Sequence, residues 1–262
     1  MEKSRIDFLS ERLLSVYETL EAIEPLTQME PDLTVDDAYA VQLEFVTKKL
    51  DQGHKIVGKK IGLTSKAMQE SLGVNEPDYG HLFEEMVVDP QNPIIKKKQV
   101  LQARVEGELA FVLKEDLTGP GVTVDQVLRA TDYIVAAIEI VDSRIADWRI
   151  KLEDTVADNG SSAFYILGKN KFSPNDLDRI GVKMDLYKNS ELINSGTGAD
   201  VLGDSAYCVA WLANKLHDYG IKLQAGEVIL AGALSAAVPA KSGDKFVCQF
   251  TENLGEVSII FE

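Results

Sequence analysis

The 262-residue sequence predicts an α+β fold, in which a mixed, β-rich core follows a helical N-terminal segment. Apolar residues recur at helical spacing in roughly the first 53 residues and in two later stretches. Elsewhere, short β-rich runs alternate with turns marked by glycine and proline. The chain contains no internal repeat and no low-complexity linker. We therefore expect a helical segment over residues 1–53 and one mixed, β-rich catalytic domain over residues 54–262.

Two helices are predicted in the N-terminal segment. The first is expected to begin at Ser4, because Asp7 three residues later resembles a capping box, and to end before Pro25. The second is expected to begin after Thr34, a favourable N-cap, and to end near Gly53. Both segments carry apolar residues at a spacing of three and four, which indicates helices with one buried face.

The rest of the chain is predicted to contain strands with two helices between them. The β-rich runs cover residues 55–62, 103–114, 133–142, 163–167, 181–188, 227–231, 245–250 and 256–261. One helix is expected near residues 123–131, where Thr123 and Gln126 form a second capping box. The other is expected over residues 205–219, with Ser205 as its cap. Because helices interrupt the strands irregularly, we expect a sheet built from non-sequential strands.

Composition excludes several classes of partner. The net charge is −15, from 27 basic and 42 acidic side chains, and such a field repels nucleic acid. No apolar run approaches the roughly 20 residues needed to span a bilayer, and the N-terminus lacks the apolar core of a signal peptide. We therefore expect a soluble, cytoplasmic protein that binds neither nucleic acid nor membrane.

The cysteines and histidines are too few and too scattered for a thiolate or imidazole metal site. Cys208 and Cys248 stand in apolar surroundings and are expected to be buried free thiols. His54, His81 and His217 stand in turn-like or helix-end contexts, where surface positions are expected.

Glu106 and Glu108 are the most informative acidic residues, because they lie within the apolar run 103–114. In a strand, alternate side chains share a face, so both carboxylates point the same way. Carboxylates about 7 Å apart repel each other unless they are solvated or bridged by a cation. A solvated outer face is the simpler interpretation of a Glu-x-Glu pair, but the flanking residues here are too apolar for it.

Glu139 is a single carboxylate within the apolar run 134–141. Burial of a lone charge is costly, so this group must be neutral, paired or bound to a metal. An ion pair with Arg144 or with a lysine remains open. Three carboxylates from two strands would suit a hard divalent ion such as Mg²⁺ or Mn²⁺ and would leave positions for substrate oxygens.

Three further polar motifs accompany the carboxylates. In the first predicted strand, Lys59 and Lys60 must lie on opposite faces, so at most one is expected to face a bound anion. Residues 76–81 are expected to form a turn that carries Asp78. Residues 154–162 are expected to form a polar loop, which could hold an anion or simply make a turn.

Taken together, these motifs are similar to those of one enzyme family. The chain resembles the 2-hydroxypenta-2,4-dienoate hydratase and 4-oxalocrotonate decarboxylase family in five segments that occur in the same order: G-K-K-I-G-L-T-S-K, E-P-D-Y-G, R-V-E-G-E-L-A-F-V-L, A-I-E-I-V-D-S-R and D-T-V-A-D-N-G-S-S. The resemblance covers nearly the whole chain. It implies the fold of the fumarylacetoacetate hydrolase-like superfamily, a mixed β-rich core with surrounding helices.

The resemblance also implies functional residues and partners. It implies a Mg²⁺ or Mn²⁺ ion held by three carboxylates, those of Glu106, Glu108 and Glu139. It implies catalytic roles for Lys60 and Asp78, and we expect Ser161 to bind the substrate carboxylate. Members of the family act on dienols and unsaturated 2-oxo acids from the meta-cleavage of catechols. They are usually homo-oligomers, and the hydratase can associate with the decarboxylase.

Two features favour the hydratase branch. The decarboxylases usually carry an aliphatic residue in place of Asp78, and residues 143–150 also look like a hydratase, whereas residues 236–239 look more like a decarboxylase. We expect water addition to 2-hydroxypenta-2,4-dienoate, giving 4-hydroxy-2-oxopentanoate, with 4-oxalocrotonate decarboxylation as the alternative. The intact set of site residues argues against a non-catalytic partner subunit. The scarcity of histidines argues against a hydrolase that cleaves C–C bonds.

Overall fold

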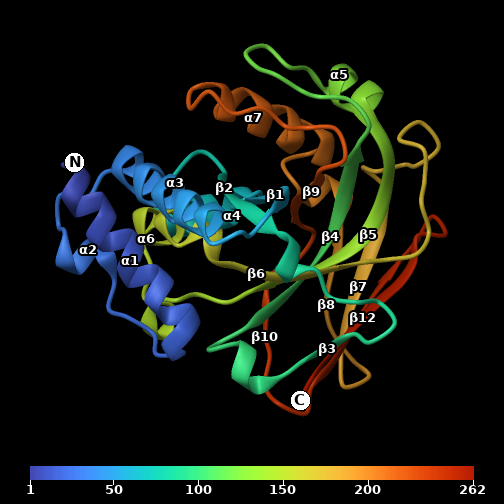
Figure 1. The fold of residues 1–262 in the computed structure, drawn as a ribbon. Coiled ribbons are helices and arrows are strands. Elements are labelled where there is room, and N and C mark those ends of the chain that lie inside the picture. The colour runs from blue at the N-terminus through green and yellow to red at the C-terminus, as the bar shows by residue number, and fades with distance from the viewer.

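The computed structural model describes residues 1–262, the side chains of residues 71 and 72 excepted. Two β-sheets form its centre (Figure 1). The larger sheet has the strand order β2-β1-β9-β4-β5-β6, with β10 paired to β4, and the smaller has the order β3-β12-β11-β7-β8. The strands are β1 (Ile56–Gly62), β2 (Asp78–Phe83), β3 (Ile94–Ile95), β4 (Arg104–Leu113), β5 (Thr131–Val141), β6 (Ser162–Leu167), β7 (Lys183–Lys188), β8 (Glu191–Thr197), β9 (Val228–Ala233), β10 (Val238–Pro239), β11 (Lys245–Phe250) and β12 (Gly255–Phe261).

The helices lie around the sheets. They are α1 (Lys3–Thr19), α2 (Leu26–Met29), α3 (Val35–Asp51), α4 (Lys66–Leu72), α5 (Val124–Ala130), α6 (Leu152–Ala157) and α7 (Ser205–His217). Helix α3 packs against α1 and α6 near the edge strand β2, and α7 packs against β9 (Figure 1). Among the described residues, no helix combines the length and the apolarity needed to cross a bilayer.

Side-chain caps begin helices α3, α4, α5 and α7, and two predictions need correction. Thr34 and Asp37 form the expected capping box of α3, and Thr123 forms that of α5. The prediction for α1 was wrong: its N-cap is Glu2, and the helix ends at Thr19 because the next residue adopts a left-handed conformation. Helix α7 is capped not by Ser205 but by the Asp204 side chain, which accepts from Ala206 N.

All eight predicted strands are present within a few residues, but β2, β3, β8 and β10 were missed. The prediction of a turn at residues 76–81 was wrong, because Asp78 begins β2, which pairs antiparallel with β1 along its length. Every residue of β2 is buried. Proline and glycine within this segment indicated a turn, whereas pairing with a distant strand decided its conformation.

The two sheets approach each other closely beneath β4. A Cβ atom on Gly107 would lie 2.9 Å from Cys248 Sγ in β11 and 2.9 Å from Met184 Cε in β7. Cys248 and Cys208 are buried and free, as expected. Because side chains alternate along a strand, the residues on either side of Gly107 point to the opposite face of the larger sheet. Those residues are Glu106 and Glu108.

Candidate metal centre and adjoining cavity

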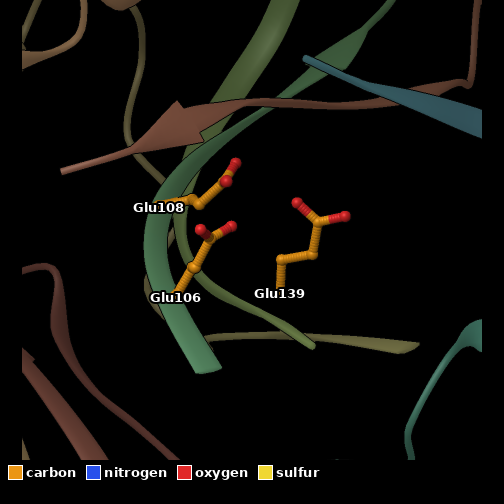
Figure 2. Close-up of side chains that lie close together, drawn as sticks. All are labelled: Glu106, Glu108 and Glu139. Atoms are coloured by element: carbon orange, nitrogen blue, oxygen red, sulfur yellow. The ribbon is translucent and has the colours of Figure 1, made fainter. Parts of the chain in front are cut away.

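Strands β4 and β5 bring the three predicted carboxylates together. Glu106 and Glu108 share one face of β4, and the strand register places Glu139 of β5 directly opposite Glu106. One oxygen of each carboxylate lies within 4.8 Å of one oxygen of the other two. Figure 2 shows the carboxyl groups of Glu106 and Glu108 facing the same space as the carboxyl group of Glu139. All three side chains are buried.

The cluster is short of hydrogen-bond donors. Gly232 N donates to Glu108 Oε2 at 2.9 Å, whereas neither carboxylate oxygen of Glu139 has a hydrogen-bond partner among the described residues. Burial and the charge of Glu139 raise the pKa of Glu106 to about 7, and burial raises the pKa values of Glu108 and Glu139 as well. Three buried carboxylates with so few donors therefore strongly favour a bound cation.

The two neighbouring lysines of β1 point to different environments. Lys60 Nζ lies 3.8 Å from Glu139 Oε1, within ion-pair range but outside hydrogen-bond range. Burial opposes the protonation of Lys60, but the charges of Glu139 and Asp78 outweigh it, so its pKa is raised. Lys59 points away and pairs with Glu227 at 2.6 Å. Only one lysine of the pair therefore faces the carboxylate cluster, as alternation along the strand predicted.

Asp78 lies at the start of β2, next to Lys60. Burial raises the pKa of its carboxyl group, and the positive charge of Lys60 opposes that rise. Its Oδ2 accepts a long hydrogen bond of 3.5 Å from Thr155 Oγ1, and its Oδ1 has no partner among the described residues. Gly62 allows this close packing, because a Cβ there would lie 2.2 Å from Asp78 Oδ1. The result is a buried carboxyl group that can change its protonation state.

Residues 158–161 form a strained turn beneath the lysine. Asn159, Gly160 and Ser161 are all left-handed, with φ values of 55°, 59° and 54°. A Cβ on Gly160 would lie 2.7 Å from Lys60 Cε, so the glycine makes room for the lysine. The prediction of a loop over residues 154–162 was partly wrong, because α6 occupies its first half. Such strain persists only where the surroundings enforce it, and it is concentrated at functional sites.

Asp158 and Arg144 hold this turn. Arg144 Nε donates to Asp158 Oδ1 at 2.6 Å, and Ser161 Oγ donates to Asp158 Oδ2 at 3.2 Å. The Asn159 side chain bonds the backbone of His81 on both sides, accepting from its N–H and donating to its carbonyl. Arg144 is thus paired with Asp158, and the alternative in which it neutralises Glu139 does not hold.

A cavity of about 90 Å³ adjoins these groups. Its polar wall contains Lys60, Asp78, Glu106, Thr155 and Ser161. The remaining wall is largely apolar and includes Leu63, Met68, Val141, Trp148 and Ile150. The size suits a small molecule with a polar end and a short apolar part.

Two residues of the cavity wall, Thr155 and Trp148, were not predicted from the sequence. They lie within residues 154–162 and 143–150, but neither residue type signals a site by itself. The expectation that His81 lies at the surface was wrong. The side chain is 1% exposed in β2, and burial with the nearby Lys59 lowers its pKa to about 3. His217, by contrast, is exposed at the end of α7.

Comparison with known proteins places this geometry in context. Residues 55–259 match the family described as fumarylacetoacetate (FAA) hydrolase C-terminal. The chain is 43% identical to a 2-hydroxyhexa-2,4-dienoate hydratase of Comamonas testosteroni over 99% of this chain and 98% of that protein. It is 44% identical to a 2-hydroxypent-2,4-dienoate hydratase of Pseudomonas putida over 84% of this chain and all of that protein.

Among solved structures, a similar one is the 4-oxalocrotonate decarboxylase of Pseudomonas putida G7, complexed with magnesium and adipate. It superposes with a TM-score of 0.96 at 34% sequence identity, covering 100% of this chain and 99% of that one.

Proposed function

Because this chain belongs to the fumarylacetoacetate hydrolase family, we propose that its three buried carboxylates hold a divalent metal ion and that it is a hydratase of short 2-hydroxydienoates. The reaction adds water to 2-hydroxypenta-2,4-dienoate and yields 4-hydroxy-2-oxopentanoate, or converts a close homologue to the corresponding 4-hydroxy-2-oxo acid. Relatives more than 40% identical over most of the chain carry names of this activity. We propose that the reaction belongs to the catabolism of aromatic compounds by meta-cleavage.

The carboxylate cluster is the observation that carries this proposal. It offers three hard oxygen donors within 4.8 Å of one another, and the Glu139 oxygens lack hydrogen-bond partners among the described residues. This donor set fits Mg²⁺ or Mn²⁺ and does not fit a metal that prefers sulfur or imidazole. Support for a divalent ion also comes from the related decarboxylase, whose structures contain magnesium or calcium.

The bound ion would act as a Lewis acid toward the carboxylate and C2 oxygen of the substrate. The side chains of the cavity would bind and orient the substrate. Lys60 is a buried ammonium group beside the cluster, so it can donate hydrogen bonds to the substrate carboxylate or the C2 oxygen. Ser161 lies in the same wall, and the expectation that it binds the substrate carboxylate stays a prediction.

Asp78 is the proposed carrier of protons. Burial raises its pKa, which suits a group that must both give and take a proton near neutral pH. It delivers a proton to C5 of the dienol while the C2 hydroxyl group gives up its own proton, so that the double bond moves to C3–C4 and C2 becomes a ketone. Carbon C4 is then electrophilic, because it is conjugated to that ketone. Water adds at C4, and C3 takes a proton.

The proposal is tested with freshly made 2-hydroxypenta-2,4-dienoate. We expect its absorbance to decay with the wild-type protein and Mg²⁺ or Mn²⁺, with 4-hydroxy-2-oxopentanoate as the identified product. Removal of the metal by a chelator should abolish the decay, and returning the metal should restore it. Equal turnover in metal-free buffer, or a different product, would refute the proposal.

Decarboxylation of 4-oxalocrotonate is the second candidate, favoured by the close structural similarity to the decarboxylase. It would use the same carboxylate cluster, but CO₂ would leave and no water would be added. The polar wall around Asp78 favours hydration, because decarboxylation needs no water at C4. Release of CO₂ from 4-oxalocrotonate, without hydration of the pentadienoate, would reverse the assignment.

A further inference from the structure

Three side-chain oxygens form a polar corner in the cavity wall. They belong to Asp78, Thr155 and Ser161, which come from β2, from α6 and from the strained turn that follows α6. Thr155 Oγ1 lies 3.5 Å from Asp78 Oδ2 and 3.5 Å from Ser161 Oγ. The three residues are 2%, 6% and 2% exposed. These separations are at the long limit for direct hydrogen bonds, a range in which a water molecule commonly bridges polar groups.

The hydrogen bonds around this corner leave its oxygen atoms free to accept hydrogen bonds from a donor. Ser161 gives its hydroxyl hydrogen to Asp158 at 3.2 Å, and Thr155 gives its own to Asp78. Both hydroxyl oxygens therefore have lone pairs to offer, and Asp78 Oδ1 is a buried acceptor without a partner among the described residues. A water molecule donates two hydrogens and needs two to four polar partners. A corner of acceptors suits it better than it suits a carboxylate anion.

The apolar part of the cavity wall cannot hold water in the same way. Leu63, Met68, Val141 and Ile150 offer no side-chain donor or acceptor of comparable strength, and the Trp148 indole N–H donates to Gln102 O. A substrate whose polar end lies at Lys60 and Glu106 would place its hydrocarbon part against these apolar side chains, in the same cavity as the corner. Water bound in the corner would direct a free lone pair toward that part.

We propose that Thr155 is a further catalytic residue, whose hydroxyl group binds, together with Asp78 and Ser161, the water molecule that is added to the substrate. This inference rests on the proposed function and assigns a site to the second reactant. The oxygen of the water forms a bond to C4, and one of its protons passes to Asp78. The electron pair of the C3–C4 double bond moves toward C3 and the C2 oxygen, and C3 then takes a proton. The sum is the addition of one H₂O, with no oxidation or reduction.

The hydroxyl of Thr155 can be removed without changing the shape of the side chain. Thr155→Val loses the oxygen, and Thr155→Ser keeps it. Thr131→Val is the matched control, because Thr131 is also buried and its hydroxyl group donates to Val127 O, in a different part of the fold. All are compared as full-length proteins with Mg²⁺, and the thermal unfolding of each is recorded.

The readout separates the two halves of the reaction. In D₂O, nuclear magnetic resonance follows deuterium entering C5, which reports ketonisation, and formation of 4-hydroxy-2-oxopentanoate, which reports water addition; both are corrected for the spontaneous reactions. For Thr155→Val we expect hydration to fall about 100-fold while ketonisation stays within about threefold, so that 2-oxopent-3-enoate accumulates. Thr155→Ser and Thr131→Val should partition the substrate as the wild type does.

Two results would overturn the role of Thr155. One is normal partitioning by Thr155→Val, and the other is an equal loss of both steps, which would mean that Thr155 only positions Asp78. If the valine variant does not fold, Thr155→Ala is judged by the same two criteria. Failure of the proposed function is distinguishable, because the wild-type protein would then show no metal-dependent hydration at all.

Discussion

Two buried clusters of charge lie near the end of β5, and they solve the problem of burial differently. The first is the carboxylate cluster of Glu106, Glu108 and Glu139, where like charges converge with few donors. The second is the pair of Arg144 and Asp158. There the guanidinium group donates to the carboxylate of Asp158, to the backbone carbonyl of Asp158 and to Ser162 O.

The difference separates a structural role from a functional one. A buried ion pair in which each nitrogen of the guanidinium group donates a hydrogen bond needs nothing further, and it fixes the turn that contacts Lys60. A buried group of like charges with unpaired oxygens is stable only when neutralised by protons or by a cation. We therefore infer that the protein retains the carboxylate cluster because it binds a ligand there.

The largest effect is expected from Glu106→Gln. The substitution keeps the shape but removes a charge, so divalent metal binding should be lost and turnover should fall on the order of 10⁴-fold, about 5.5 kcal/mol of transition-state stabilisation. The metal-free protein should be no less stable than the wild type, because repulsion within the cluster is relieved. Titration calorimetry, steady-state kinetics and unfolding in a chelator measure the three quantities. The exposed Glu115→Gln serves as the control.

Arg144→Met should act on the fold and not on the metal. Without the guanidinium group, Asp158 remains buried and unpaired, which should lower the free energy of unfolding by about 3 kcal/mol. The protein that remains folded should still bind the metal, because the ligands lie on β4 and β5. Arg144→Lys keeps the charge but not the forked geometry, so its free energy of unfolding should lie between those of the wild type and Arg144→Met. Urea unfolding at neutral pH measures these free energies. If Arg144→Met is as stable as the wild type, the structural role assigned to the Arg144–Asp158 pair is wrong.

His81 is a further buried ionisable side chain, and among the described residues it has no acidic ion-pair partner, so it must be neutral. Its pKa is lowered to about 3 by burial and by Lys59, compared with 6.5 for the free side chain. The neutral form therefore stabilises the fold above pH 6.5, and this stability is lost as the pH falls toward 3. Between pH 7 and pH 5 we expect His81 by itself to lower the free energy of unfolding by about 2 kcal/mol, whereas protonation of buried carboxyl groups such as Glu106 acts in the opposite direction, so the effect is measured as the difference between the wild type and His81→Gln. His81→Gln should reduce this slope, and an unchanged slope would count against a neutral buried histidine.

The smallest effect is expected outside both clusters. Thr34→Ala removes the capping box of α3 and should destabilise the protein by about 1 kcal/mol. Metal affinity and turnover should be unchanged, because the helix cap supports neither cluster directly. A change in turnover at saturating metal would show that the N-terminal helices take part in the site. The boundary drawn after residue 53 stays a prediction.

Much of the fold and most of the candidate site could be predicted from local patterns. Alternation along a strand put Glu106 and Glu108 on one face and separated Lys59 from Lys60, and the structure has both arrangements. The segments that failed are those in which pairing overrides local preference. Strand β2 contains turn-forming residues, but β1 provides a partner for its whole length. His81 was misplaced for the same reason, because the burial of that strand cannot be seen from its neighbours in the sequence.

The sequence by itself determined which side chains are available and their local periodicity: three carboxylates in apolar runs, one lysine on each face of β1, and the caps of α3 and α5. Only the tertiary structure decided which of them meet. The β4–β5 register placed Glu139 opposite Glu106, the turn after α6 gave Arg144 its partner Asp158, and α6 brought Thr155 to Asp78. Periodicity depends on backbone geometry over a few residues, whereas these contacts join segments tens of residues apart, and long-range packing selects them.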